Sequence, residues 1–151
     1  KDYAAERLYR DARVTSIYEG STQMQVVAAI RYATSGFYSD MMNEYASQPI
    51  ASKWELLRNE LVEAQGVYQQ ALDSVLATNN QAMIDWHGRR LVEMAGYIIM
   101  GHLLLQDACA NETLFEKSAK TFIRWTVAQV KQHDNFIESS QVDDMADYRF
   151  S

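Results

Sequence analysis

A short segment near the start of the sequence brings together a carboxylate, an aromatic ring and hydroxyl groups that could support acid–base chemistry. Glu19 lies between Tyr18 and Gly20, and Ser21 and Thr22 follow directly. A hydroxyl residue that begins a helix stands beside free backbone N–H groups and the positive end of the helix dipole. A glutamate shielded from water there would have a raised pKa and could act as a general base. The same residues also fit a capping turn with a solvated glutamate.

Elsewhere, the residues that could bind a metal ion or act as a nucleophile are scattered. His87 and His102 fall on one predicted helix face but are fifteen residues apart, about 22 Å along the helix axis at 1.5 Å per residue. None of the three histidines has a glutamate three residues before it, so the Glu-x-x-His motif of metal sites in helical bundles is absent. We therefore expect packing histidines and no metal site. The single cysteine, Cys109, excludes an internal disulfide and is expected in the core.

The charge of the chain argues against two classes of partner. Fourteen basic and twenty acidic side chains give a net charge of −6, which disfavours binding to nucleic acid and to anionic membranes.

The longest apolar stretch, residues 98–105, is far shorter than the ~20 residues that span a bilayer. No secretory signal segment is visible, so we expect a cytoplasmic location. Because the first residue is Lys1 rather than methionine, we expect a piece of a longer protein.

The elements that must position Glu19 are predicted to be helices, and the predicted fold class is all-α. The 151 residues contain one proline and six glycines, too few for the frequent turns of a β-sandwich or barrel. A charged helix is expected over 2–13, and Ser21 or Thr22 can cap a second helix that ends near Gly36. Four isolated glycines are expected to permit close contacts between helices rather than to cradle a phosphate: Gly66, Gly88, Gly96 and Gly101.

Three long amphipathic helices are predicted in the second part of the chain. Ser52 and Glu55 have the spacing of a capping box, and Asn79 or Asn80 and then Asn111 can cap the next two helices. Apolar residues recur at three- and four-residue steps along each of them. The expected core positions are Trp54, Leu57, Leu61, Ala64, Tyr68, Ala71, Val75; Ile84, His87, Leu91, Met94, Ile98, His102, Leu105, Cys109; and Phe115, Ala119, Phe122, Thr126, Val130, His133, Ile137. Such helices, each about 40 Å long, would form an up-and-down antiparallel bundle.

The segment around Glu19 resembles a family signature. Arg-Asp-Ala-Arg at 10–13 and Ile-Tyr-Glu-Gly-Ser-Thr-Gln-Met-Gln at 17–25 are similar to the motif R-D-A-[KR]-x-x-x-I-Y-E-G-T-x-x-I-Q near the C-terminus of acyl-CoA dehydrogenases. The chain differs at Ser21, where the family usually has threonine, and at Met24, where it usually has isoleucine. The helices from Ser52 onward resemble the helical region that longer members append after the dehydrogenase core.

The resemblance implies a role for each residue of the motif. Glu19 would abstract the α-proton of an acyl-CoA thioester while FAD accepts the hydride from the β-carbon. The backbone N–H of Glu19 would help to hold the thioester carbonyl, because the developing enolate needs hydrogen bonds in a dry site. The implied contacts are Tyr18 and Gly20 with the substrate, and Ile17, Ser21 and Gln23 with FAD.

The resemblance also implies a division of the chain and a set of partners. Residues 1–35 would end the catalytic helical domain, 36–51 would connect, 52–140 would form the appended bundle, and 141–151 would be an acidic tail. The full-length protein would be an oxidoreductase of fatty acyl metabolism, a homo-oligomer that uses an electron-transfer partner. The 151-residue chain alone is expected to be inactive and free of FAD. The alternative is a helical interaction or oligomerisation module without catalysis, in which Glu19 is a turn residue.

Overall fold

The computed structural model describes residues 8–12 and 22–141, with side chains from 8–12 and 25–141. All regular structure in these ranges is helical, as the sequence predicts. Residues 8–12 form a short helical segment inside the helix predicted over 2–13. The elements that follow are α2 (Thr22–Thr34), α3 (Phe37–Ala46), the 3-10 helix η1 (Ser52–Trp54), α4 (Glu55–Ala77), α5 (Gln81–Ala110) and α6 (Glu112–Ser139).

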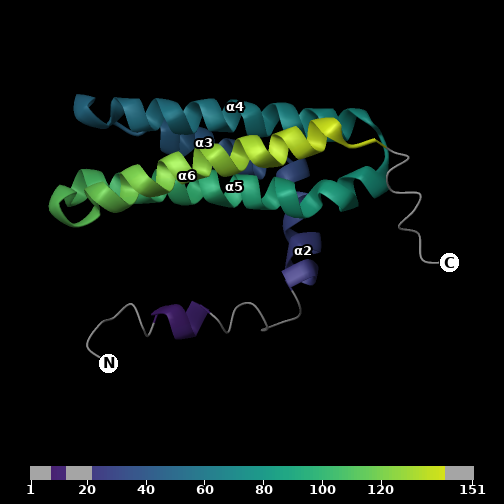
Figure 1. Cartoon of the computed structure of the whole chain (residues 1–151), viewed down its shortest axis with the longest axis horizontal. Coiled ribbons are helices and arrows are strands. Elements are labelled where there is room, and N and C mark those ends of the chain that lie inside the picture. Colours follow the sequence, from purple (N-terminus) through teal and green to yellow (C-terminus); the bar gives the residue numbers. More distant parts are fainter. Residues whose placement is uncertain (1–7, 13–21, 142–151) are drawn as a thin grey trace.

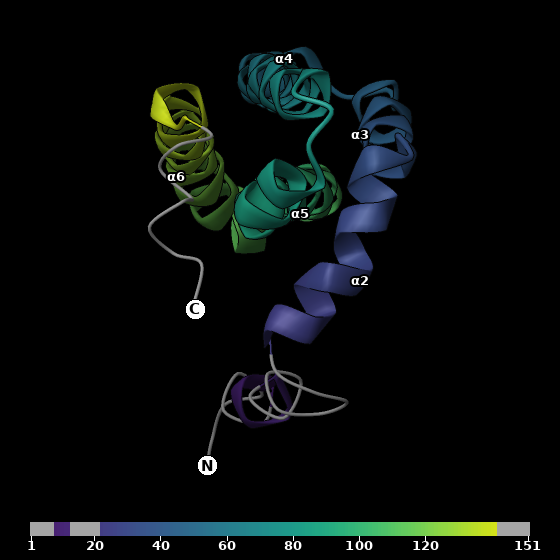
Figure 2. The same ribbon diagram turned by 90° about the vertical axis from the view of Figure 1, so that its right-hand side faces the viewer.

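The three long helices α4, α5 and α6 lie side by side and alternate in direction, which confirms the predicted antiparallel bundle (Figure 1). Viewed from the end, α6 lies on one side of α5, and α2 and α3 lie on the other (Figure 2). Helix α5 packs against α2, α3, α4 and α6. It is therefore the central element, and it connects the helix that follows the Glu19 segment to the rest of the bundle.

Local signals fix most of the helix ends. Gly36 adopts the left-handed conformation (φ 83°) between α2 and α3, where glycine carries no steric penalty. The Asn80 side chain accepts a hydrogen bond from the backbone N–H of Ala82 at 2.9 Å and caps α5. Asn111 accepts one from the N–H of Leu114 at 3.3 Å and caps α6. Because α5 ends at Ala110 and α6 begins at Glu112, Asn111 is the whole connection between these two helices.

The predicted capping box at the start of α4 is wrong. Ser52 lies inside η1, and neither η1 nor α4 has a side-chain cap. The Trp54 N–H donates to the Ala51 carbonyl at 2.9 Å, so the chain enters α4 through a tight 3-10 turn. This turn seats the buried Trp54 ring in the same apolar cluster as Leu57 and Leu105. Burial of the indole outweighs the single hydrogen bond that a serine cap would contribute.

Most of the predicted core positions are buried, but Ile84, Phe115 and His133 are only half-buried. The errors at Cys109 and Phe122 have one geometric cause. All seven positions predicted for α4 are buried. Cys109, however, is exposed, and Ala108 occupies the core position instead. Phe122 is half-buried, and Ile123 is completely buried in its place. An apolar stripe advances by three or four residues per turn, and in both helices the step that the structure takes differs by one residue from the predicted step.

None of the helices within 8–12 and 22–141 combines the length and the apolar character that a bilayer crossing requires.

Candidate functional site

The residues predicted to do chemistry lie at the edge of what the structure describes. Ile17, Tyr18, Glu19, Gly20 and Ser21 fall outside the described residues. The backbone of Gln23 is part of α2, whereas its side chain is not among those described. Helix α2 begins at Thr22, as predicted, and therefore directly follows this segment. The described residues therefore constrain the predicted site through the position of α2 on the bundle.

Helix α2 is seated on the bundle by one apolar face. Val26, Ile30 and Ala33 are buried, and they recur at the four- and three-residue steps of a helix face. The Ile30 side chain lies over Gly88 of α5: a Cβ placed on Gly88 would lie 3.6 Å from Ile30 Cγ1 and 3.7 Å from Cδ1. A Cβ at Gly88 would thus make ordinary van der Waals contact with Ile30, so the contact itself does not require glycine at position 88.

Two further isolated glycines also lack the predicted role. A Cβ on Gly66 or on Gly96 would meet no atom within 4 Å, so neither residue permits a close approach. A Cβ on Gly101 would come within 2.6 Å of Leu61 Cδ2, so the predicted close contact holds there. Of these four glycines, only Gly101 therefore stands where close packing excludes a Cβ and offsets the energetic cost of a glycine inside a helix.

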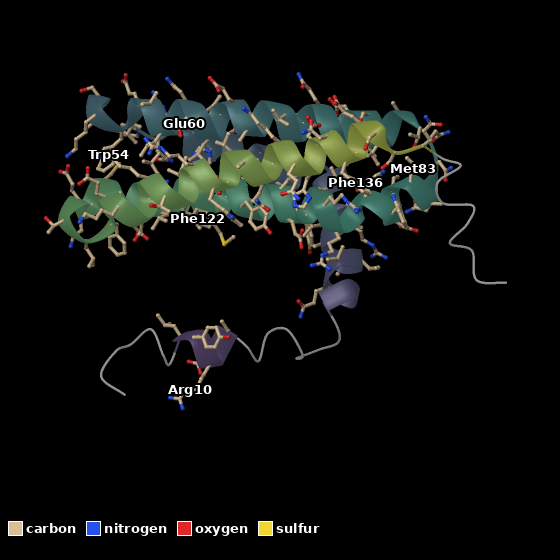
Figure 3. All side chains as sticks on the ribbon, viewed as in Figure 1. Arg10, Trp54, Glu60, Met83, Phe122 and Phe136 are labelled. Atoms are coloured by element: carbon tan, nitrogen blue, oxygen red, sulfur yellow. The ribbon has the colours of Figure 1, made fainter. Side chains whose placement is uncertain are left out.

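One pocket of about 420 Å³ lies at the end of the bundle where α4 connects to α5 and where α6 ends, near Met83 (Figure 3). It is lined by Ser74, Val75, Thr78, Met83, Ile137, Glu138 and Ser140. The hydroxyls of Ser74 and Thr78 donate to backbone carbonyls of their own helix. Its lining thus offers one charged group, Glu138, and no residue of the predicted site.

A second pocket, of about 440 Å³, is a shallow depression on α6 lined by Lys117, Ser118, Thr121, Phe122 and Trp125. It belongs to an exposed aromatic surface that α5 and α6 share, and the Phe122 side chain is labelled there in Figure 3. The Tyr97 ring of α5 meets Trp125 edge-on at 4.8 Å between centroids. Trp125 remains 42% exposed, and the Phe122 ring lies 5.5 Å from it between centroids. We call Tyr97, Phe122 and Trp125 the aromatic surface.

The aromatic surface does not follow from the predicted core stripes, because a stripe identifies only the buried positions of a helix. The signal was nevertheless present: Trp125 stands directly beside the stripe residue Thr126 and one turn from Phe122. A large aromatic residue off the core stripe of an amphipathic helix indicates an exposed apolar surface.

Two of the predicted packing histidines are buried, and each has at least one ring nitrogen without a hydrogen-bond partner. His87 is 0% exposed, and neither ring nitrogen has a partner. Burial, together with a smaller effect of the nearby Arg90, lowers the pKa of His87 to about 4. Burial likewise lowers the pKa of His102 to about 4; this residue is 2% exposed, and the Tyr45 ring stacks against it at 6.3 Å. Both rings are therefore neutral near pH 7.

The third histidine takes part in a polar contact between α5 and α6. Glu93 accepts a hydrogen bond from Arg89 Nε at 2.8 Å, and its other carboxylate oxygen lies 3.4 Å from His133 Nε2. One turn away, the Arg90 guanidinium lies 3.8 Å from the centroid of the Phe136 ring. No cluster of three metal-ligating side chains occurs in the described parts of the chain. These contacts join two helices and do not form a reactive centre.

The sequence of residues 34–145, well over half of the chain, matches the family described as "Acyl-CoA dehydrogenase C terminal". The chain belongs to this acyl-CoA dehydrogenase C-terminal family. The matched residues include α3 to α6, the helices that make up the bundle. The resemblance inferred from the sequence is thereby confirmed at the level of the family.

A solved structure has the same fold as this acyl-CoA dehydrogenase C-terminal domain. It is the acyl-CoA dehydrogenase family protein from Porphyromonas gingivalis, which is 26% identical in sequence with a TM-score of 0.71. The similarity covers 76% of this chain and 98% of that chain. A comparison with curated protein sequences gave no significant match.

The family match and the motif are independent observations on this acyl-CoA dehydrogenase domain. The motif occupies residues 10–25, and the matched residues begin at 34. No residue contributes to both. The assignment of the bundle to the family therefore does not depend on the resemblance around Glu19.

Proposed function

We propose that this chain is the C-terminal region of an FAD-dependent acyl-CoA dehydrogenase, in which Glu19 is the general base. One observation carries the proposal: the motif at 10–25 directly precedes a domain of the acyl-CoA dehydrogenase C-terminal family. Two independent features, in the order expected for one protein, point to the same enzyme class. The proposed reaction forms a double bond between the α- and β-carbons of an acyl-CoA thioester.

The residues of this chain supply the proton transfer and hold the thioester. The Glu19 carboxylate takes the α-proton, and the electron pair left on the α-carbon delocalises into the thioester carbonyl. The Glu19 backbone N–H donates a hydrogen bond to that carbonyl oxygen, where negative charge develops. Tyr18 would form a wall on the thioester side of the site. Gly20 lets the backbone pass close to the substrate.

The donor groups at the start of α2 suit a flavin. Because α2 begins at Thr22, its first backbone N–H groups have no partner within the helix. In the proposed site, the Ser21 hydroxyl and the Gln23 amide would supply further donors, and Ile17 would supply an apolar contact. Such a set fits the polar edge and the apolar face of an isoalloxazine ring. When bound, FAD would supply the acceptor for the hydride that leaves the β-carbon, and an electron-transfer partner would then reoxidise the enzyme.

The experiment that tests this proposal replaces the base in the full-length protein. Glu19→Gln keeps the size of the side chain and removes its ability to take a proton. Flavin reduction by acyl-CoA in a single turnover should slow by about 10²–10⁴-fold, while acyl-CoA binding persists through the backbone N–H. Glu44→Gln, in α3, is the matched control and should reduce its flavin at the parental rate. Reduction by Glu19→Gln within tenfold of the parent would show that Glu19 is not the base.

The aromatic surface favours a second candidate function, an interaction or oligomerisation module. Side chains of this kind and exposure often mark a protein–protein contact. Trp125→Glu would place a charge at the centre of this surface without disturbing a buried position. In a purely interacting module, Trp125→Glu abolishes assembly and Glu19→Gln has no effect on any activity. In a dehydrogenase that assembles through the bundle, Trp125→Glu abolishes assembly and Glu19→Gln slows flavin reduction.

A further inference from the structure

We propose that helix α5 positions the catalytic segment through α2, with Gly88 and Ile30 as the positioning residues. This inference rests on the proposed function and names how the appended bundle contributes to it. The observation behind it is the contact between Ile30 and Gly88, which seats α2 on the central helix of the bundle. Helix α2 begins three residues after Glu19 in the sequence, so the proposed catalytic segment is joined directly to the start of α2.

The contact leaves room at position 88 for a Cβ but not for a larger side chain. Gly88 is buried, and the space next to it is filled by three carbon atoms of Ile30, which would lie 3.6, 3.7 and 3.9 Å from a Cβ at that position. These are ordinary van der Waals distances, so alanine at position 88 fits without displacing α2. A larger side chain does not fit, because its next carbon atoms would enter the volume of Ile30.

The far end of α2 is held, so a displacement at Ile30 becomes a rotation of the helix. The chain turns at Gly36 in the left-handed conformation. Around this turn the Tyr32 ring contacts Phe37 at 5.5 Å and Tyr38 at 6.2 Å. If α2 pivots there, Ile30 lies six residues from the pivot and Thr22 lies fourteen residues from it. A movement at Ile30 is therefore more than doubled at the N-terminus of α2, next to the catalytic segment.

The chemistry is sensitive to such a movement. Proton abstraction requires the carboxylate and the substrate carbon at near-attack distance, and a misplacement of about 1 Å costs about a hundredfold in rate. Because this rotation of α2 more than doubles any movement of Ile30, a shift of about half an ångström at Ile30 becomes about 1 Å at Thr22. The bundle thus supports the reaction rate without contributing a residue that touches the substrate.

Matched volume changes test this inference. Gly88→Val adds three carbon atoms against Ile30, and the stiff χ1 of valine in a helix prevents it from turning away. Ile30→Ala removes three carbon atoms, so the double variant restores the volume at the contact. Gly88→Ala is the conservative variant. Gly96→Val is the control in the same helix, because a Cβ at Gly96 meets no atom within 4 Å.

Two measurements are made on each variant. In the 151-residue chain, backbone amide hydrogen exchange over residues 26–33 reports whether α2 stays seated. In the full-length holoenzyme, single-turnover flavin reduction and the acyl-CoA dissociation constant separate the chemical step from binding. Gly88→Val should speed exchange at 26–33 and slow flavin reduction by at least about tenfold, with the dissociation constant changed less. Gly88→Ala and Gly96→Val should match the parent, and Ile30→Ala added to Gly88→Val should restore the rate.

Each contrary result has a distinct meaning. Unchanged exchange at 26–33 in Gly88→Val overturns the claim that this contact seats α2. Faster exchange with an unchanged rate of flavin reduction overturns the positioning role, while the Glu19→Gln result continues to support the proposed function. A slow Gly88→Val enzyme that the second substitution does not rescue indicates general damage and also overturns the inference. Normal flavin reduction by Glu19→Gln overturns the proposed function and this inference with it.

Discussion

Gly101 of α5 faces the Leu61 side chain of α4 so closely that a Cβ on Gly101 would lie 2.6 Å from Leu61 Cδ2. Leu61 is fully buried, and its neighbours leave it little freedom to move aside. The two helices can therefore approach at this point only because position 101 lacks a side chain.

Gly101→Ala is expected to destabilise the bundle even though alanine is the better helix former. Overpacking costs about 1–3 kcal/mol, against a gain of about 1 kcal/mol from helix propensity. Gly96→Ala, in open space on the same helix, should gain that propensity alone. Urea denaturation of the two variants gives the difference between their free energies of unfolding. A Gly101→Ala variant as stable as Gly96→Ala would contradict the close contact.

Adjacent substitutions in α6 should differ sharply in their effect. Ile123 is 0% exposed and lies in the cluster around Leu61, so Ile123→Ala should cost about 2–5 kcal/mol. Phe122 is half-buried on the aromatic surface, so Phe122→Ala should cost clearly less. Denaturant unfolding with a common m-value measures both. If Phe122→Ala were the more damaging variant, α6 would have to turn Phe122 rather than Ile123 towards the core.

The contrast between Phe122 and Ile123 also shows what a sequence can establish about this fold. The helices, their caps at Asn80 and Asn111 and the α4 stripe follow from local chemistry, and the structure has them. The exact core residue in the middle of a long helix does not follow, because Phe122 and Ile123 are adjacent apolar residues and the choice between them depends on where the other helices lie. The contact between Ile30 and Gly88 joins residues far apart in sequence, and no local pattern signals its partner.

The candidate site, too, can be predicted from the sequence only in part. The motif around Glu19 is continuous in sequence, so its residue types and spacing could be recognised directly. The seat of α2 on α5 could not be recognised, since it depends on the packing of two helices separated by α3 and α4. The capping box at Ser52 failed for a related reason: a correct local signal was overridden by burial of Trp54.

The two buried histidines should make the stability of the bundle depend on pH. His87 and His102 have pKa values lowered to about 4 by burial, against about 6.5 in the unfolded chain. The unfolded state therefore binds more protons between these values, and stability falls as the pH falls from about 6.5 to about 4. Each histidine should remove about 2 kcal/mol by pH 5.

Urea denaturation at pH 7 and pH 5 measures this dependence, and His102→Leu provides the test of its origin. The variant should lose about half of the pH dependence that the two histidines give the parent. Stability that stays constant from pH 7 to pH 5 in the parent would contradict the burial of both rings as neutral groups.

The purified 151-residue chain is expected to carry no flavin. In the proposed function, the start of α2 supplies only part of the contacts to FAD, and neither described pocket includes a residue of that segment. The chain should therefore be colourless, and titration with FAD should leave the flavin fluorescence unchanged. A yellow preparation with one flavin per chain would show that residues 1–151 form a complete site.

The single residue between α5 and α6 has a consequence for how this family can vary. Asn111 ends one helix and caps the next, so the connection contains no other residue that could absorb a change in its length. Inserting or deleting one residue beside it would turn α6 by about 100° about its own axis and would bring a different face of the helix against the core. Homologous sequences should therefore keep the length of this connection fixed, whereas the extended stretch around Pro49 should accept insertions and deletions.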